Sequence, residues 1–212
     1  VIARQARLIA LWMGVGFIHG VMNTDNMSIS GETIDYGPCA FMDADDPDKV
    51  FSSIDHMGRY AYRKQPEIAH SNLACFASTV LPLIDENNET AIKEAKNALN
   101  SFSSNFNVAW SSSLKKKVGL REEQSGDFEL VQDLLHRMAV NKSDFTLTFR
   151  RLCELPGRIE QTSASPDSLV RVLFDNPSSF DEWAVKWRAR LMREKQEDSE
   201  RQAEMRTVNP SY

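Results

Sequence analysis

Three observations in the sequence predict a mainly α-helical fold with one short β element. Apolar residues recur at helical spacing through much of the chain, most regularly over residues 127–140. Hydrophobic residues make up 42% and charged residues 26% of the 212 positions, proportions that are typical of folded globular domains. Thr33 and Ile34, just ahead of Asp35, suggest a short strand. We therefore expect a core of packed helices.

The opening stretch, VIARQARLIALWMGVGFIHG, predicts a core helix. Arg4, Gln5 and Arg7 interrupt its apolar residues, so it falls short of the run of about 20 apolar residues that a membrane span needs. The stretch also lacks a Met start and the basic-then-apolar pattern of a signal peptide. We expect no membrane partner, and a chain that is truncated at both ends.

After an irregular segment over residues 38–66, which contains prolines and an acidic run, the remaining pattern is helical. Helices are predicted from Glu67 to the acidic turn at 85–88, over 89–114, 127–140, 143–155 and 180–207, and from a start at Pro166. Asp144 is the expected N-cap of the helix over 143–155. The alternating charges of the last predicted helix indicate a solvated surface.

Charge and cysteine content narrow the classes of function. The formal net charge is −5, whereas general polyanion binders need clustered Lys and Arg, so no nucleic-acid partner is expected. Cys39, Cys75 and Cys153 are odd in number and widely spaced, which fits neither a disulfide scaffold nor a zinc site and favours a reducing compartment. We expect Cys75 and Cys153 to lie in the core.

Residues 19–37, HGVMNTDNMSISGETIDYG, contain the residues most suited to catalysis and metal binding in this chain. In protein kinases the catalytic loop H-R-D-L-x-x-x-N precedes D-F-G, and the Asn and second Asp hold Mg²⁺. On that pattern His19 takes the His position, Asn26 the Asn, and Asp35 the Asp of D-F-G. Val21 stands where a kinase has its catalytic Asp, and valine accepts no proton. Either the loop is inactive or its base lies elsewhere.

Asp25, next to Asn26, is the candidate for that base. Asn26 and Asp35 supply oxygen ligands suited to Mg²⁺, with Mn²⁺ as the alternative, because Mg²⁺ usually takes one or two protein ligands beside phosphate and water. The alternative is a loop whose Asn, Asp and Ser side chains bond only to their own backbone. For His19 a structural role is predicted.

Longer stretches resemble the selenoprotein O (YdiU) family. They are HGVMNTDNMSISGETIDYGPCAFMD, DPDKVFSSIDHMGRYAY and QPEIA with Asn72-Leu73-Ala74 and Leu81-Pro82-Leu83, and looser similarity continues to DEWAVKWRARL. The resemblance implies a protein-kinase-like C-terminal lobe with a short β element around the DYG loop. It also implies an enzyme that binds ATP in a flipped orientation and transfers AMP to Ser, Thr or Tyr hydroxyls of target proteins.

Carried over by position, the family's proton acceptor falls on Asp25, its Mg²⁺ ligands fall on Asn26 and Asp35, and Asp35 also lies beside the nucleotide phosphates. The chain departs from the family's usual residues at Ser71 and Cys75. Phe51 stands where some members carry a Cys that pairs with a C-terminal Cys, so the resemblance does not imply that redox switch here. The implied compartment is the cytoplasm for a bacterial protein and the mitochondrion for a eukaryotic one.

The implied organisation is a single kinase-like C-lobe over 1–212. It consists of the catalytic and metal loop 19–37, an activation-like segment 38–66 and a helical remainder 67–212. We expect the N-lobe and C-terminal tail of the family to be absent, and the isolated chain to be inactive without that lobe. Two alternatives to an adenylyltransferase stay open, an ordinary protein kinase of the same fold and a non-catalytic interaction module.

Overall fold

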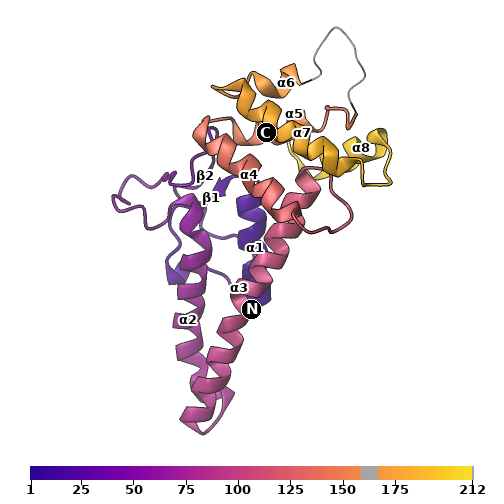
Figure 1. Cartoon of the computed structure of the whole chain (residues 1–212). Coiled ribbons are helices and arrows are strands. Elements are labelled where there is room, and N and C mark those ends of the chain that lie inside the picture. The colour runs from indigo at the N-terminus through magenta and orange to yellow at the C-terminus, as the bar shows by residue number, and fades with distance from the viewer. Residues whose placement is uncertain (159–166, 212) are drawn as a thin grey trace. The chain divides into compact units, whose positions relative to one another are not determined.

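The computed structural model describes residues 1–158 and 167–211. In these residues the fold is mainly α, with one two-stranded sheet, which confirms the predicted class (Figure 1). The chain divides into two compact units, one of residues 1–41 and 47–110, the other of residues 42–46 and 111–212. The single kinase-like lobe over 1–212 stays a prediction.

The first unit contains the predicted catalytic loop. Its elements are α1 (Ile2–Gly14), β1 (Phe17–Ile18), the 3₁₀ turn η1 (Thr24–Asn26), β2 (Ala40–Phe41), the 3₁₀ turn η2 (Tyr62–Lys64), α2 (Gln65–Ile84) and α3 (Asn88–Lys117), whose last turns belong to the second unit. No long helix interrupts residues 38–61, as their prolines predict.

Helix α1 is the predicted core helix, and it packs against α2. Ala6, Ile9 and Ala10 lie on its buried side and are at most 1% exposed. The hydroxyl of Tyr62 donates a hydrogen bond of 2.6 Å to the carbonyl oxygen of Met13, which also accepts one of 3.2 Å from the Gly16 backbone N–H at the end of this helix.

The β element flanks the loop and does not include the residues predicted for it. Strand β1 pairs antiparallel with β2, with Phe17 opposite Phe41 and Ile18 opposite Ala40. Thr33 and Ile34 form no strand, so that prediction is wrong. The Ile34 carbonyl oxygen, a group that a strand ladder would use, bonds to the His19 ring instead, and the Thr33 hydroxyl bonds to the Trp12 indole.

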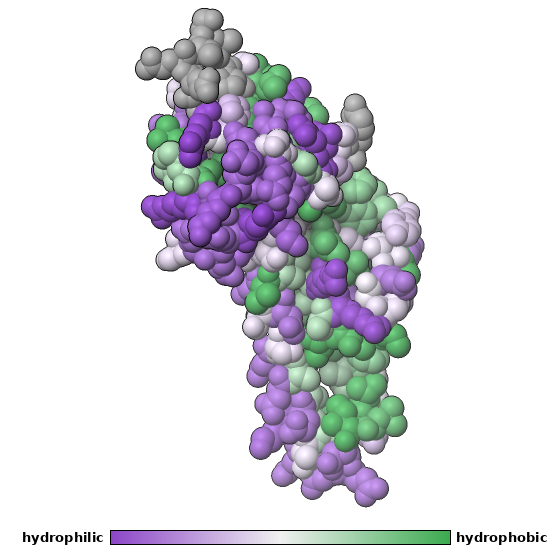
Figure 2. All heavy atoms as spheres, turned by 90° about the vertical axis from the view of Figure 1, so that its right-hand side faces the viewer, coloured by the Kyte–Doolittle hydropathy of each residue, from purple (hydrophilic) through white to green (hydrophobic). Residues whose placement is uncertain are grey.

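Helices α2 and α3 run in opposite directions on either side of a turn at residues 85–87 (Figure 1). The rings of His70 and Phe102 join them at a centroid distance of 5.6 Å. In the lower part of Figure 2, where this hairpin lies, hydrophobic residues gather along one side and hydrophilic residues along the other. Leu83 is 85% exposed near the tip.

The second unit is helical in its described residues. Its elements after α3 are α4 (Asp127–Val140), α5 (Phe145–Leu152), α6 (Ser168–Arg171), α7 (Pro177–Leu191) and α8 (Asp198–Val208). The bounds of α4 match the prediction, and Asp144 caps α5 by accepting a hydrogen bond of 2.7 Å from the Leu147 amide, also as predicted. The predicted start at Pro166 lies outside the described residues.

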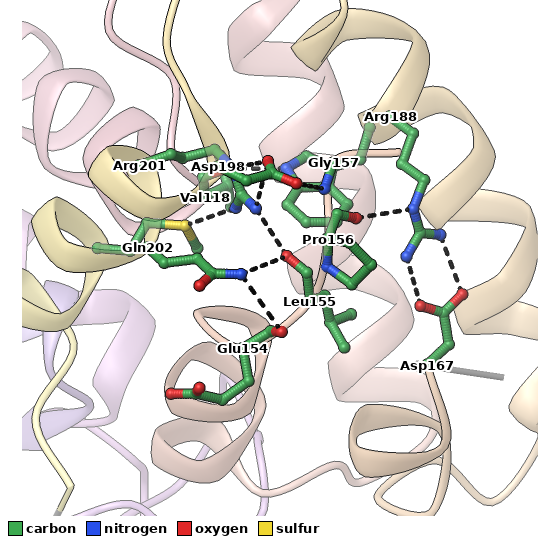
Figure 3. Close-up of polar contacts among 12 residues, drawn as sticks. Val118, Glu154, Leu155, Pro156, Gly157, Asp167, Arg188, Asp198, Arg201 and Gln202 are labelled. Carbon is green, nitrogen blue, oxygen red and sulfur yellow. Dashed lines mark hydrogen bonds and ion pairs between the residues drawn. The ribbon is translucent and has the colours of Figure 1, made fainter. Parts of the chain in front are cut away.

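The predicted helix over 180–207 is wrong, because α7 and α8 are separate helices. Asp198 accepts a hydrogen bond of 2.8 Å from the Gly157 amide (Figure 3). Arg201, which is 2% exposed, donates 2.6 Å to the Leu155 carbonyl oxygen and also bonds to Asp198. These contacts fix the first turn of α8 against the segment after α5, which breaks the helix although its charge pattern is continuous.

Lys117, at the end of α3, is a buried lysine that is 3% exposed. Its Nζ atom lies 4.3 Å from the ring centroid of Phe149 and 5.8 Å from that of Phe145. Burial disfavours the charged form and lowers the pKa of Lys117 from 10.5 to about 7, although the faces of the rings stabilise the cation in part. Between these pH values the unfolded chain holds a proton that the folded chain has lost, so stability rises with pH there.

We expect Lys117→Met to raise the free energy of unfolding at pH 7 by about 1–3 kcal/mol, because it removes this desolvation cost. The gain should shrink towards pH 10, where the unfolded lysine also loses its proton. Urea denaturation at both pH values measures it. The exposed neighbour Lys116→Met is the matched control and should change little. A loss of stability at pH 7, or an equal gain at both pH values, would contradict the expectation.

Candidate active site

The loop 19–37 is fixed at its start by Gln65, the first residue of α2. The Gln65 amide accepts a hydrogen bond of 3.0 Å from the His19 backbone N–H and donates one of 3.0 Å to the Phe17 carbonyl oxygen. Gln65 is fully buried, so both groups are satisfied away from water. This one side chain holds the end of β1 and the first residue of the loop on α2.

A second amide on α2 holds the middle of the loop. Asn72 donates hydrogen bonds of 2.8 Å to the Met22 carbonyl oxygen and to the Met27 sulfur. The hydroxyl of Tyr60 donates to the Asn23 side chain from the segment before η2. Residues on both sides of Asp25 are therefore anchored.

The far part of the loop lies on α1. The indole N–H of Trp12 donates 2.8 Å to the Thr33 hydroxyl, and the Gln5 amide donates to the Ser28 carbonyl oxygen. Gly31 has φ +79°, and a Cβ atom there would lie 2.6 Å from the Cβ of Arg4. Only glycine permits this backbone conformation and this approach to α1 without a shift.

His19 has the structural role predicted for it. The ring is fully buried; its Nε2 lies 2.8 Å from the Ile34 carbonyl oxygen, and its Nδ1 accepts from the Val21 amide at 3.4 Å. With Nε2 carrying the proton, both ring nitrogens are satisfied. His19 thus joins the two ends of the loop.

Asp25 and Asn26 lie together in η1. The Asn26 amide donates 3.0 Å to the Val21 carbonyl oxygen, which leaves its Oδ1 atom without a donor among the described residues. Asp35 has φ +55°, a conformation that non-glycine residues rarely adopt. No hydrogen bond joins Asp35 directly to η1; the link runs through Ile34, His19 and Val21.

The carboxylates of Asp25 and Asp35 are exposed, and no described residue donates a hydrogen bond to either or forms an ion pair with it. Residues 1–158 and 167–211 contain no group of three or more His, Cys, Asp or Glu side chains placed to hold a metal. A site with one carboxylate, one amide oxygen and phosphate oxygens still fits Mg²⁺. The free oxygens of Asn26 and Asp35 suit it, and their metal-binding role stays a prediction.

Comparison with known proteins decides the family. The family model described as protein adenylyltransferase SelO matches residues 1–212. The chain is 56% identical over 212 residues to the protein nucleotidyltransferase YdiU of Bradyrhizobium diazoefficiens, and 54% identical over 212 residues to that of Bradyrhizobium sp. strain ORS 278.

This chain belongs to the SelO family. The alignments with the two Bradyrhizobium proteins cover the whole of this chain. So does the alignment with the YdiU protein of Methylorubrum populi, at 53% identity. The chain spans 42% of the length of the two Bradyrhizobium relatives and 43% of that of Methylorubrum. The resemblance found from the motifs is confirmed.

In this SelO-family chain, sequence reasoning missed the roles of Gln65 and Asn72. A signal was present, because two amide side chains seven residues apart share one face of a helix, and a polar pair on a buried face needs partners. Cys75, predicted to be in the core, is exposed, whereas Cys153 is buried as predicted. In the described part of the chain, no helix is long and apolar enough to cross a membrane.

Proposed function

We propose that this chain forms part of a protein adenylyltransferase, which transfers AMP from ATP to Ser, Thr or Tyr hydroxyls of target proteins and releases pyrophosphate. The names of its relatives support nucleotidyl transfer as the class of reaction. The observation that carries the proposal is the anchored loop, which presents the free oxygens of Asp25, Asn26 and Asp35 on a frame of buried hydrogen bonds.

In this proposal Asp25 accepts the proton of the target hydroxyl. The hydroxyl oxygen then forms a bond to the α-phosphorus of ATP while the bond from that phosphorus to the bridging oxygen breaks, and pyrophosphate leaves. Asn26 and Asp35 would hold Mg²⁺, which neutralises phosphate charge when bound. The buried contacts of Gln65 and Asn72 keep these groups in place before the substrates bind.

Val21 argues against an ordinary kinase. It occupies the position of the kinase base, and its backbone amide and carbonyl groups are bonded to His19 and Asn26. Asp25 is the first carboxylate after Val21 in the loop, and no residue in the described part of the chain pairs with it. A base at Asp25 instead of position 21 is consistent with a bound ATP that presents its α-phosphorus to the target hydroxyl, whereas a kinase presents the γ-phosphorus.

The test uses ATP labelled separately at the α- and γ-phosphates. The assay contains this chain alone and, in parallel, this chain in place of the corresponding region of the B. diazoefficiens relative, with that intact relative as the positive control. With Mg²⁺ we expect label from the α-position on protein hydroxyls in the chimera, and none with this chain alone. Asp35→Ala should reduce it by about 10²-fold or more, because a phosphate-side metal ligand is lost.

Label from the γ-position alone would contradict adenylyl transfer and favour a kinase. Absence of both labels, in a chimera that melts cooperatively and binds ATP, would favour the non-catalytic module. Melting and ATP binding are measured first, so a misfolded chimera is recognised before the transfer assay.

A further inference from the structure

Residues 42–46, in the middle of the predicted activation-like segment, form a strap on the second unit. They belong to that unit, whereas the residues on both sides of them belong to the first. The Asp45 backbone N–H donates a hydrogen bond of 2.9 Å to the Ser143 carbonyl oxygen, and the Phe145 backbone N–H donates one of 2.7 Å to the Asp43 carbonyl oxygen. These two bonds flank a single antiparallel β-bridge. The backbone contact of the strap is therefore short and open to local regulation.

Asp45 is the buried carboxyl group of the strap. It is 4% exposed, whereas the side chains of Asp43 and Asp46 are exposed. No residue in the described part of the chain donates a hydrogen bond to the Asp45 carboxyl group or forms an ion pair with it. A carboxylate that loses its hydration without gaining a donor or a cation is costly, so burial at this position favours the neutral acid.

The charged groups on the strap and on the segment that it pairs with do not offset this cost. On the pairing segment, Lys142 is exposed and the Asp144 carboxylate is the N-cap of α5. Lys117, buried against the rings of α5, forms no ion pair with Asp45 in the described residues. Burial, and to a smaller extent the negative charge of Asp46, raise the pKa of Asp45 from 3.8 to about 7.

We propose that a proton on Asp45 holds the strap on the backbone at 143–145, so that the strap opens more often as the pH rises towards neutrality. An opened strap exposes the Asp45 side chain to water, where it is ionised above about pH 4, whereas the closed strap keeps the proton up to about pH 7. Between these values a rise in pH therefore favours the opened strap. Opening frees the chain between β2 and η2, and it does not depend on the proposed nucleotide chemistry.

Hydrogen exchange of this chain, followed by NMR at the backbone amides of residues 45 and 145, measures the opening. After correction for the intrinsic exchange rate at each pH, we expect the opened fraction to rise about tenfold or more between about pH 5.5 and pH 7.5. Asp45→Asn keeps the size of the side chain and cannot ionise, so it should abolish the rise. Asp43→Asn, at an exposed carboxylate of the same strap, is the matched control and should retain it.

Two further readouts separate the strap from the rest of the second unit. Loss of the Lys117 proton has the opposite effect, since it stabilises the fold as the pH rises, and amides inside α7 should not follow those of the strap. The carboxyl carbon of Asp45, followed by NMR without any substitution, should titrate with a midpoint near pH 7. A midpoint near pH 4, equal opening at both pH values, an unchanged rise in Asp45→Asn, or the same rise throughout α7 would overturn the proposal.

Discussion

Asp25→Asn is expected to reduce α-phosphate transfer by about 10²–10⁴-fold, the range for loss of a general base. Asn keeps the size of the side chain and cannot accept the hydroxyl proton. The carboxylate is exposed and has no protein partner among the described residues, so its replacement should leave the fold of the loop unchanged. The loss should therefore appear in kcat, with ATP binding preserved.

The matched control is Glu32→Gln. Glu32 is an exposed carboxylate in the same loop and accepts a hydrogen bond of 2.8 Å from the Ser30 hydroxyl. Its replacement removes the same charge and should change transfer by less than about twofold. Equal losses in the two variants would show that Asp25 acts only through the charge of the loop. Full activity of Asp25→Asn would exclude it as the base.

The sequence predicts the helices well where a local rule decides them. The apolar spacing over 127–140 gives both ends of α4, and Asp144 marks the start of α5 through its side chain. The break between α7 and α8 could not be found this way, because it depends on Asp198 and Arg201 meeting the backbone after α5, some 41 to 46 residues earlier in the chain. Such contacts leave no local pattern in the charge alternation.

The candidate site divides in the same way. The predicted base, Asp25, and the predicted metal ligands, Asn26 and Asp35, can be found from the motif alone. The structure places Asp25 and Asn26 in one turn. The hydrogen bonds that hold the loop could not be found from the sequence, since the partners of Gln65, His19 and Phe17, lie 46 and 48 residues earlier in the chain. Thr33 illustrates the converse, because a residue with strand propensity bonds to Trp12 and forms no strand.

In the second unit, Trp187→Ala is expected to lower the free energy of unfolding by about 3–5 kcal/mol. Trp187 is fully buried in α7 and stacks on Trp183 at a centroid distance of 5.6 Å. Its indole N–H donates 2.8 Å to the Val118 carbonyl oxygen. Alanine leaves a cavity and removes the donor from a buried carbonyl, and the two losses add to a large share of a typical domain's stability.

Urea denaturation followed by circular dichroism measures this loss, and Trp187→Phe separates its two causes. Phe fills much of the cavity and lacks the N–H, so it should recover a part of the stability and leave a deficit of about 1–3 kcal/mol from the unpaired Val118 carbonyl. Val185→Ala, at a position 70% exposed on the same helix, should stay within about 0.5 kcal/mol of the parent. If Phe restored full stability, packing alone would account for Trp187; if it were no better than Ala, the hydrogen bond would dominate, and the stacked tryptophan pair would contribute little.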